Sequence, residues 1–156
     1  MWKYREKEVH TLEDMPEGSF GFIYEITHIP TGKKYIGKKQ VISVRKKALG
    51  KKEIALLPDK RAKKYKIVKA EGDWKSYYGS NLEVKQLIKE GKQFEFTREI
   101  LIFVPSKKLL SYYENKYLFE RGVIEPNSTY FNDNIEGRYF KKDFLNVSLM
   151  NFDEEY

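Results

Sequence analysis

Two short runs of alternating aromatic and β-branched residues predict a β-hairpin early in the chain. The first is Ser19 to Thr27, SFGFIYEIT, and the second is Lys33 to Gly37, KKYIG. The segment HIPTG at residues 28–32 places a Pro and a Gly between them, as a turn requires. A third strand is expected over Phe94 to Val104, where alternation gives way to an apolar run typical of a strand buried on both faces.

Helices are predicted mainly by the residues at their ends. A capping box, Ser80-Asn-Leu-Glu83, starts a run of apolar residues at helical spacing that ends at Gly91. A second helix is expected to begin at Ser106 and to end at Gly122, again between a serine cap and a glycine. A further helix is predicted over residues 41–49, before Gly50. The order of elements indicates one mixed α/β domain.

Composition narrows the class of protein. With 40% hydrophobic and 34% charged residues, the chain has neither the composition of a disordered protein nor an apolar run of the roughly 20 residues that a membrane span requires. The N-terminal residues lack the continuous apolar region of a secretory signal, so a cytoplasmic location is expected. Because the chain has no cysteine, disulfides, thiolate nucleophiles and zinc–thiolate sites are excluded.

The positive charge is concentrated in one segment. Residues 45–78 carry 12 Lys or Arg and 4 acidic residues, a net +8, while the whole chain carries +7. Phosphate groups of a nucleic acid are the expected partners, although a solvated lysine-rich loop would have the same composition. The predicted nucleic-acid-binding residues are Lys46, Lys47, Lys51, Lys52, Lys60, Arg61, Lys63, Lys64 and Lys66.

The hairpin carries two short motifs, Gly21-Phe-Ile-Tyr24 and Tyr35-Ile-Gly37. Together they resemble the paired motifs of the GIY-YIG nucleases, with Phe22 as an insertion into the first. In this family an arginine follows the second motif on a helix, and Arg45 stands eight residues after Gly37. The remaining family positions are matched in order by a Tyr before a helix, a helical Glu and a late Asn, which are Tyr78 (preferred here to Tyr77), Glu114 and Asn132.

The resemblance covers about residues 20–137 and is nearest to small phage-type, Seg-like homing endonucleases. It implies a three-stranded antiparallel sheet flanked by helices and a metal-dependent endonuclease acting on DNA with one Mg²⁺ or Mn²⁺ ion at Glu114. Residues 1–19 are then an N-terminal extension, residues 46–77 approximately a basic insertion, and residues 138–156 an acidic tail. The part after Lys142 is expected to be mobile.

The chemistry of each side chain agrees with these roles. Glu114 lies at the margin of the buried stripe of its helix, and a lone carboxylate suits a Mg²⁺ ion that keeps most of its waters. The guanidinium of Arg45 offers a planar fork of donors to phosphate oxygens. Tyr24 is a candidate general base, and Tyr35 or Tyr78 could orient the water or share its proton. Singly, each of these residues also has a structural reading, as a core aromatic, a helix-edge carboxylate or a turn asparagine.

Several alternatives stay open at this point. A restriction or repair nuclease of the same fold competes with a homing endonuclease, and a catalytically inactive nucleic-acid-binding protein is the alternative from a different class. Homing relatives usually carry a separate sequence-reading domain, for which the residues beyond Gly137 are too few. Either the basic segment reads sequence, or the protein forms a homodimer, or cutting is relatively nonspecific.

Overall fold

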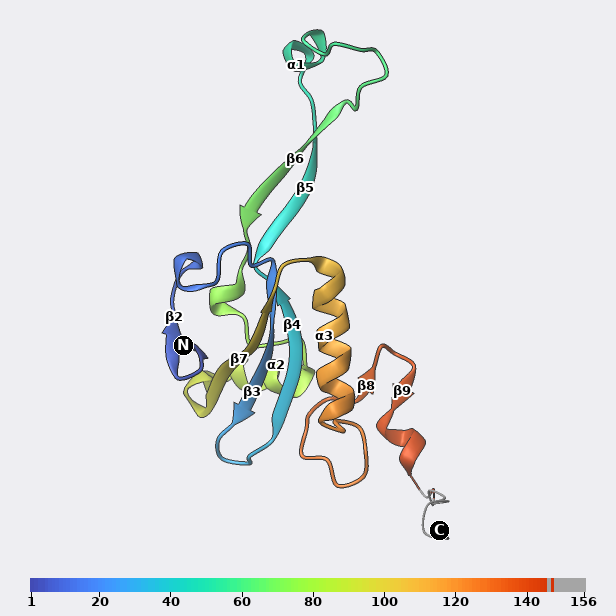
Figure 1. Ribbon diagram of the computed structural model, residues 1–156. Helices are drawn as coiled ribbons and strands as arrows, with labels where there is room; N and C mark the ends of the chain where they lie inside the picture. The colour runs from blue at the N-terminus through green and yellow to red at the C-terminus, as the bar shows by residue number, and fades with distance from the viewer. Residues whose placement is uncertain (146, 148–156) are drawn as a thin grey trace.

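A central sheet of five strands, in the order β2-β1-β7-β3-β4, organises the protein in the computed structural model (Figure 1). The structure describes residues 1–145 and residue 147. The strands are β1 Trp2–Tyr4, β2 Lys7–Val9, β3 Gly21–His28, β4 Lys34–Gln40 and β7 Phe96–Val104. The predicted hairpin and third strand are confirmed as β3, β4 and β7, and Tyr24 lies opposite Gly37 in the antiparallel register.

The prediction of three strands, all antiparallel, is wrong. Residues 1–19, which the sequence sets apart as an extension, contribute β1 and β2, and β1 runs parallel to β7. The side chain of Trp2 is 1% exposed, and its indole N–H donates to the Trp74 carbonyl oxygen at 2.8 Å. Strands of three residues joined by a tight turn give too short a pattern to be recognised from sequence.

The helix predicted over residues 41–49 is also wrong, because this segment forms strand β5, Ile42–Ala48. It pairs antiparallel along its whole length with β6, Tyr65–Glu71. The short helix α1, Lys51–Ala55, lies at the tip of this two-stranded ribbon, which extends away from the central sheet in Figure 1. The β-branched residues of the segment favour a strand once a partner strand is present.

Helices α2, Leu82–Lys89, and α3, Lys107–Glu120, confirm the two helices predicted from their capping residues. The side chain of Asn81, rather than Ser80, caps α2 by accepting from two backbone N–H groups, and Ser106 caps α3. Four 3₁₀ turns and a small hairpin complete the described elements. Their bounds are η1 Leu12–Asp14, η2 Trp74–Ser76, η3 Gln93–Glu95, η4 Lys141–Phe144, β8 Asn134–Ile135 and β9 Tyr139–Phe140.

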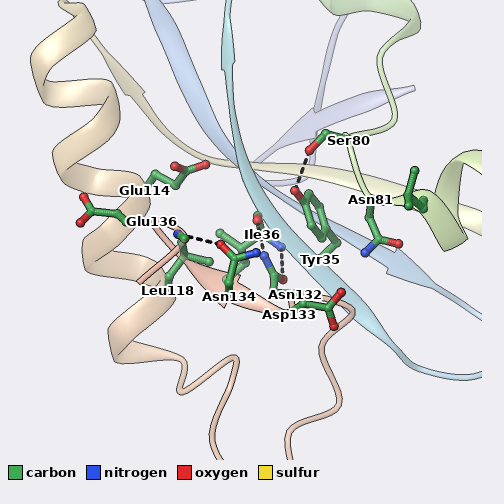
Figure 2. Close-up of a pocket in the computed structure, with 12 residues that line it drawn as sticks. Tyr35, Ile36, Ser80, Asn81, Glu114, Leu118, Asn132, Asp133, Asn134 and Glu136 are labelled. Atoms are coloured by element: carbon green, nitrogen blue, oxygen red, sulfur yellow. Dashed lines mark hydrogen bonds between the residues drawn. The ribbon is translucent and has the colours of Figure 1, made fainter. Parts of the chain in front are cut away.

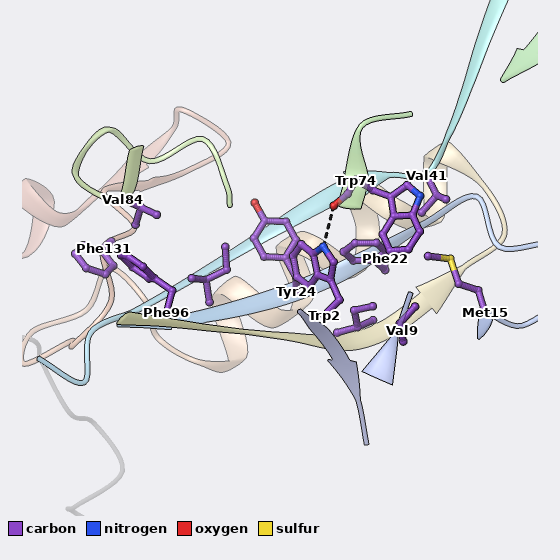
Figure 3. Packing of buried hydrophobic residues seen from close by; sticks show 12 residues of the cluster. Trp2, Val9, Met15, Phe22, Tyr24, Val41, Trp74, Val84, Phe96 and Phe131 are labelled. Carbon is purple, nitrogen blue, oxygen red and sulfur yellow. Dashed lines mark hydrogen bonds between the residues drawn. The ribbon is translucent and has the colours of Figure 1, made fainter. Parts of the chain in front are cut away.

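The sheet is packed on both faces, so β3 is buried on both sides. Phe22, Tyr24 and Ile26 join a core on the α2 side with Trp2 and Trp74 (Figure 3). On the opposite side, Ile23 packs with residues of α3 and the segment that follows it. The result is a three-layer arrangement, with β3 as its most enclosed strand.

Strand β4 lies at the edge of the sheet, and residues 129–132 run beside it. The backbone N–H of Phe131 donates to the Lys34 carbonyl, and the N–H of Lys34 donates to the Thr129 carbonyl. The amide of Asn132 then accepts from the Ile36 N–H at 3.1 Å and donates to the Ile36 carbonyl at 2.9 Å. These bonds satisfy backbone groups that an open sheet edge would leave unpaired.

Within residues 1–145, no helix is long and apolar enough to cross a membrane. Of the segment expected to be mobile, residues 146 and 148–156 lie outside the described residues. Residues before them form β9 and η4.

Replacing Trp2 with Ala tests the place of the N-terminal strand in the core. We expect the free energy of unfolding to fall by about 3–5 kcal/mol, because a fully buried indole is removed. Phe94→Ala is the matched control, since Phe94 is 78% exposed, and should cost less than about 0.5 kcal/mol. Denaturant unfolding of the two variants measures both values, and equal effects would show that β1 is not integral to the core.

Candidate active site

A pocket of about 470 Å³ lies over the edge of β4, between the start of α2 and the middle of α3 (Figure 2). Tyr35 and Ser80 line it on the α2 side, and Glu114 lines it on the α3 side. Asn132 forms part of its floor beside Ile36. The pocket therefore joins residues from both faces of the sheet around its exposed edge.

Tyr35 presents the phenol that lines the pocket. Its hydroxyl lies 2.9 Å from Ser80 Oγ, and either oxygen can donate. Burial raises the pKa of Tyr35, and the negative charge of Glu114 adds to this effect. The phenol is therefore neutral near pH 7 in the protein alone, and its oxygen can accept a hydrogen bond while its own O–H donates to Ser80.

Tyr24 lies behind Tyr35 and is 1% exposed. Burial, followed by Tyr77 and Tyr35, raises its pKa well above the ordinary value. Its ring crosses Gly37, where an added Cβ would be 2.7 Å from Tyr24 Cζ. On the other side, a Cβ on Gly79, whose φ is +94°, would be 3.3 Å from the Tyr24 hydroxyl oxygen. Two glycines thus make the room that this phenol occupies.

Glu114 lines the pocket together with two other carboxylates, Asp133 and Glu136, and its side chain is 23% exposed. Burial raises its pKa, the charge and backbone of Lys38 lower it, and Glu136 raises it again. The Lys38 Nζ is 3.9 Å from the Glu114 carboxylate and donates to Ser111 Oγ at 3.0 Å. A cation and a partly desolvated carboxylate therefore stand together at the pocket wall.

Tyr77, and not Tyr78, lies beside the tyrosine pair. The ring centroids of Tyr77 and Tyr24 are 5.9 Å apart in an edge-to-face arrangement. Tyr78 instead stacks on the guanidinium of Arg98 at 4.1 Å and packs against Phe96. The structure therefore brings Tyr77 beside Tyr24 and does not bring Tyr78 there, because adjacent residues of the extended segment point in different directions.

Arg45 is not brought into the pocket. It lies in the exposed strand β5 and lines a different hollow together with Lys39 and Asp73. Arg45 was expected to follow the second motif on a helix. This expectation is wrong, because the segment forms strand β5. Lys38 is the cation that the structure places beside Glu114.

Asn132 is brought to the pocket, but its amide is fully engaged with the backbone of Ile36. It is 6% exposed and holds the β4 edge. The sequence pattern did not single out Gly79 or Lys38, and it offered Tyr77 only as the alternative to Tyr78. Gly79 had a signal, since a glycine between two structural elements can take a positive φ at little cost, whereas Lys38 was one lysine among many.

The donor atoms fit a hydrated divalent cation better than a cage of protein ligands. Among the described residues there is no group of three or more His, Asp or Glu that could hold a metal together. Glu114 offers one carboxylate at an open, polar pocket. Mg²⁺ is commonly held through one or two carboxylates while it keeps several waters.

The fold is a mixed α+β domain with a polar pocket at one edge of its sheet, and a comparison with family models shows the class of protein to which it belongs. Residues 2–135 match the family described as "Putative endonuclease segE, GIY-YIG domain". The chain therefore belongs to the SegE-type GIY-YIG endonucleases, and the resemblance of its motifs is confirmed. No curated protein and no solved structure matches the chain.

The raised pKa of Glu114 predicts that its carboxylate destabilises the folded state. In the folded protein this group binds its proton more tightly than at the ordinary pKa of 4.5, so the destabilisation is present above the folded pKa and disappears below pH 4.5. Glu114→Gln should therefore be as stable as the unmodified protein or more stable at pH 7. The difference should vanish as the pH falls to about 4.

Thermal unfolding between pH 4 and 8 measures this dependence. Glu120→Gln is the control, since Glu120 lies on the same helix, is exposed and pairs with Lys116 at 3.9 Å. A loss of stability in Glu114→Gln at pH 7 would mean that this carboxylate contributes to the fold instead.

Proposed function

We propose that the pocket over the β4 edge hydrolyses phosphodiester bonds of DNA. Membership of an endonuclease family makes the chain an endonuclease, and DNA is the polymer that such a domain implies. The observation that supports this pocket is the placement of Tyr35 and Glu114, from separate elements, on facing walls of one cavity. A scissile phosphate between them would contact a phenol on one side and a carboxylate with Lys38 on the other.

Each side chain then has a distinct task. The Tyr35 oxygen accepts a hydrogen bond from the attacking water and aligns it, while the phenol O–H donates to Ser80. Lys38 offsets the negative charge that grows on the phosphate oxygens as the water oxygen bonds to phosphorus and the bond from phosphorus to the leaving oxygen breaks. The proton that the water loses passes to solvent in the open pocket, and the leaving oxygen takes up a proton in exchange. Tyr24 and Tyr77 support the position of Tyr35 from behind.

Glu114 is the residue that would hold a divalent cation, Mg²⁺ or Mn²⁺. GIY-YIG nucleases generally depend on such an ion. When bound, it would supply a Lewis acid for the phosphate and the leaving oxygen. The carboxylate must be ionised to bind it, so its raised pKa makes metal affinity fall on mild acidification.

The nine basic residues that the sequence predicts to bind nucleic acid, between Lys46 and Lys66, are proposed to contact the DNA backbone. They are exposed and surround α1 and the loop before β6. Lys66 pairs with Glu53 at 2.8 Å, and Lys46 lies 4.7 Å from the Tyr65 ring centroid. A homing role is preferred for the enzyme because its family is described by a Seg-type endonuclease, with restriction or repair as the competing roles.

Plasmid cleavage tests the assignment of the pocket. The full chain should nick or cut plasmid DNA with Mg²⁺ and should be inactive with EDTA. Glu114→Gln should abolish cleavage while DNA binding stays within a few fold, because the phosphate-binding lysines are unchanged. Tyr35→Phe should lower the rate by on the order of 100-fold, and Tyr24→Phe by less. Full cleavage activity of Glu114→Gln would contradict the assignment of Glu114 as the metal ligand. A larger loss of rate in Tyr24→Phe than in Tyr35→Phe would assign the alignment of the water to Tyr24.

The salt dependence of binding tests the basic segment. Replacing Lys60, Arg61, Lys63 and Lys64 with Gln should weaken binding about equally on all sequences. The slope of log affinity against log salt concentration should become shallower by roughly 0.9 for each phosphate that the variant no longer neutralises. Thermal stability should hardly change, since all these side chains are exposed. An unchanged slope would show that the DNA path avoids this loop.

A further inference from the structure

The ribbon of β5 and β6 leaves two faces open to solvent. All seven residues of each strand are paired, and the ribbon extends beyond the central sheet (Figure 1). An isolated two-stranded ribbon is marginally stable in water, because it has no layer to pack against. Apolar side chains are exposed on both of its faces, with Val68, 37% exposed, beside Arg45, and Ile67 and Val44, 61% and 46% exposed, on the other side. Such exposure on a ribbon with no layer to pack against points to a partner that covers it.

The two faces differ in composition. Residues directly opposite in an antiparallel pair point to the same side, and successive residues alternate. One face carries Ser43, Arg45, Lys47, Lys66, Val68 and Ala70, and we call it the Arg45 face. The other carries Ile42, Val44, Lys46, Ala48, Tyr65, Ile67, Lys69 and Glu71.

The Arg45 face is the one that is continuous with the candidate active site. Arg45 and Lys39 line the same hollow at the base of the ribbon. Lys39 Nζ lies 4.1 Å from the ring centroid of Tyr77, which packs on Tyr24. The opposite face instead borders a hollow with Ser106 and Lys107 at the start of α3. A duplex at the pocket would therefore meet the Arg45 face.

The charges of this face are poorly balanced within the chain. Lys47 and Lys66 stand directly opposite each other, an arrangement that is unfavourable in a sheet. Lys66 forms an ion pair with Glu53. Arg45 and Lys47 form no ion pair within the part of the chain that the structure describes. A polyanion against this face would relieve the repulsion.

We propose that the Arg45 face of the ribbon enters the major groove of duplex DNA and that Arg45 reads a guanine there. The inference rests on the proposed DNA endonuclease function. Each strand has seven residues, which span about 23 Å at roughly 3.3 Å per residue. A two-stranded ribbon fits the major groove, about 12 Å wide, and is too broad for the minor groove, about 6 Å wide.

The side chains of the face match base edges and not just phosphates. The guanidinium fork of Arg45 suits the O6 and N7 acceptors of guanine, the most frequent specific contact in this groove. Val68 lies directly opposite Arg45 and is 37% exposed, so it offers an apolar contact to a neighbouring thymine methyl. Lys47 lies nearer the tip of the ribbon, within reach of the backbone beside these bases.

Binding selection from a randomised duplex library tests this reading of sequence. The full chain is used in EDTA, so that binding is measured without cleavage. Arg45→Gln should lose a guanine preference of at least about tenfold at one position. Lys69→Gln is the matched control, since it removes one positive charge from the adjacent pair on the opposite face. It should leave the preference unchanged.

A second measurement changes the DNA instead of the protein. Replacing the preferred guanine with 7-deazaguanine removes the N7 acceptor in the major groove. This should weaken binding of the unmodified protein several-fold and should have no further effect on Arg45→Gln. A selection profile that is unchanged in Arg45→Gln, or an equal effect of 7-deazaguanine on both proteins, would overturn the proposal.

These results are separable from the test of the proposed function. Loss of cleavage with a retained guanine preference would contradict the nuclease pocket and support the ribbon. Cleavage without any preference affected by Arg45 would support the pocket and contradict the ribbon.

Discussion

The position of β4 at the edge of the sheet is the constraint on which the site depends. Backbone groups at a sheet edge need partners, and here residues 129–132 supply them through main-chain bonds and the amide of Asn132. The same segment is held by Asn81, the cap of α2, through the Phe131 carbonyl, and by Glu25, which accepts from Tyr130 at 3.0 Å. Closing this edge therefore fixes the start of α2 beside β4, while α3 packs directly on the same strand. The pocket is the space left between them.

Burial has opposite consequences for stability and for chemistry in this pocket. It raises the pKa of Tyr35 and of Glu114, so the phenol stays neutral and the carboxylate is costly to ionise. Both effects destabilise charged forms in the free protein. The ionised carboxylate is therefore stabilised when a cation binds, and the neutral phenol can form hydrogen bonds at the phosphate. This is expected of a site arranged for binding and not for stability. Gly37 and Gly79 belong to the same arrangement, because they admit the Tyr24 ring behind Tyr35.

Much of the central fold could be predicted from sequence, because its signals are local. The hairpin and helices α2 and α3 follow from alternation and capping residues such as Ser106. The strands that were missed or predicted as a helix depend on pairing with residues distant in sequence. Strand β1 pairs with β7 across nearly a hundred residues, and β5 becomes a strand through β6, which follows α1 and a loop. Of the candidate residues, the structure brings Tyr35, Glu114 and Asn132 to one pocket, whereas Arg45 and Tyr78 depended on backbone directions that no local pattern specifies.

The pocket between Tyr35 and Glu114 is proposed as the place where a divalent cation and a phosphate meet. Titration of isotope-labelled protein with Mn²⁺, followed by NMR line broadening, measures the location of the ion directly. Signals of Tyr35, Glu114 and the Asn132 side chain should broaden first, and Glu114→Gln should abolish this effect. Broadening centred on Asp73 and Glu71 at the base of the ribbon, unaffected by Glu114→Gln, would contradict the account.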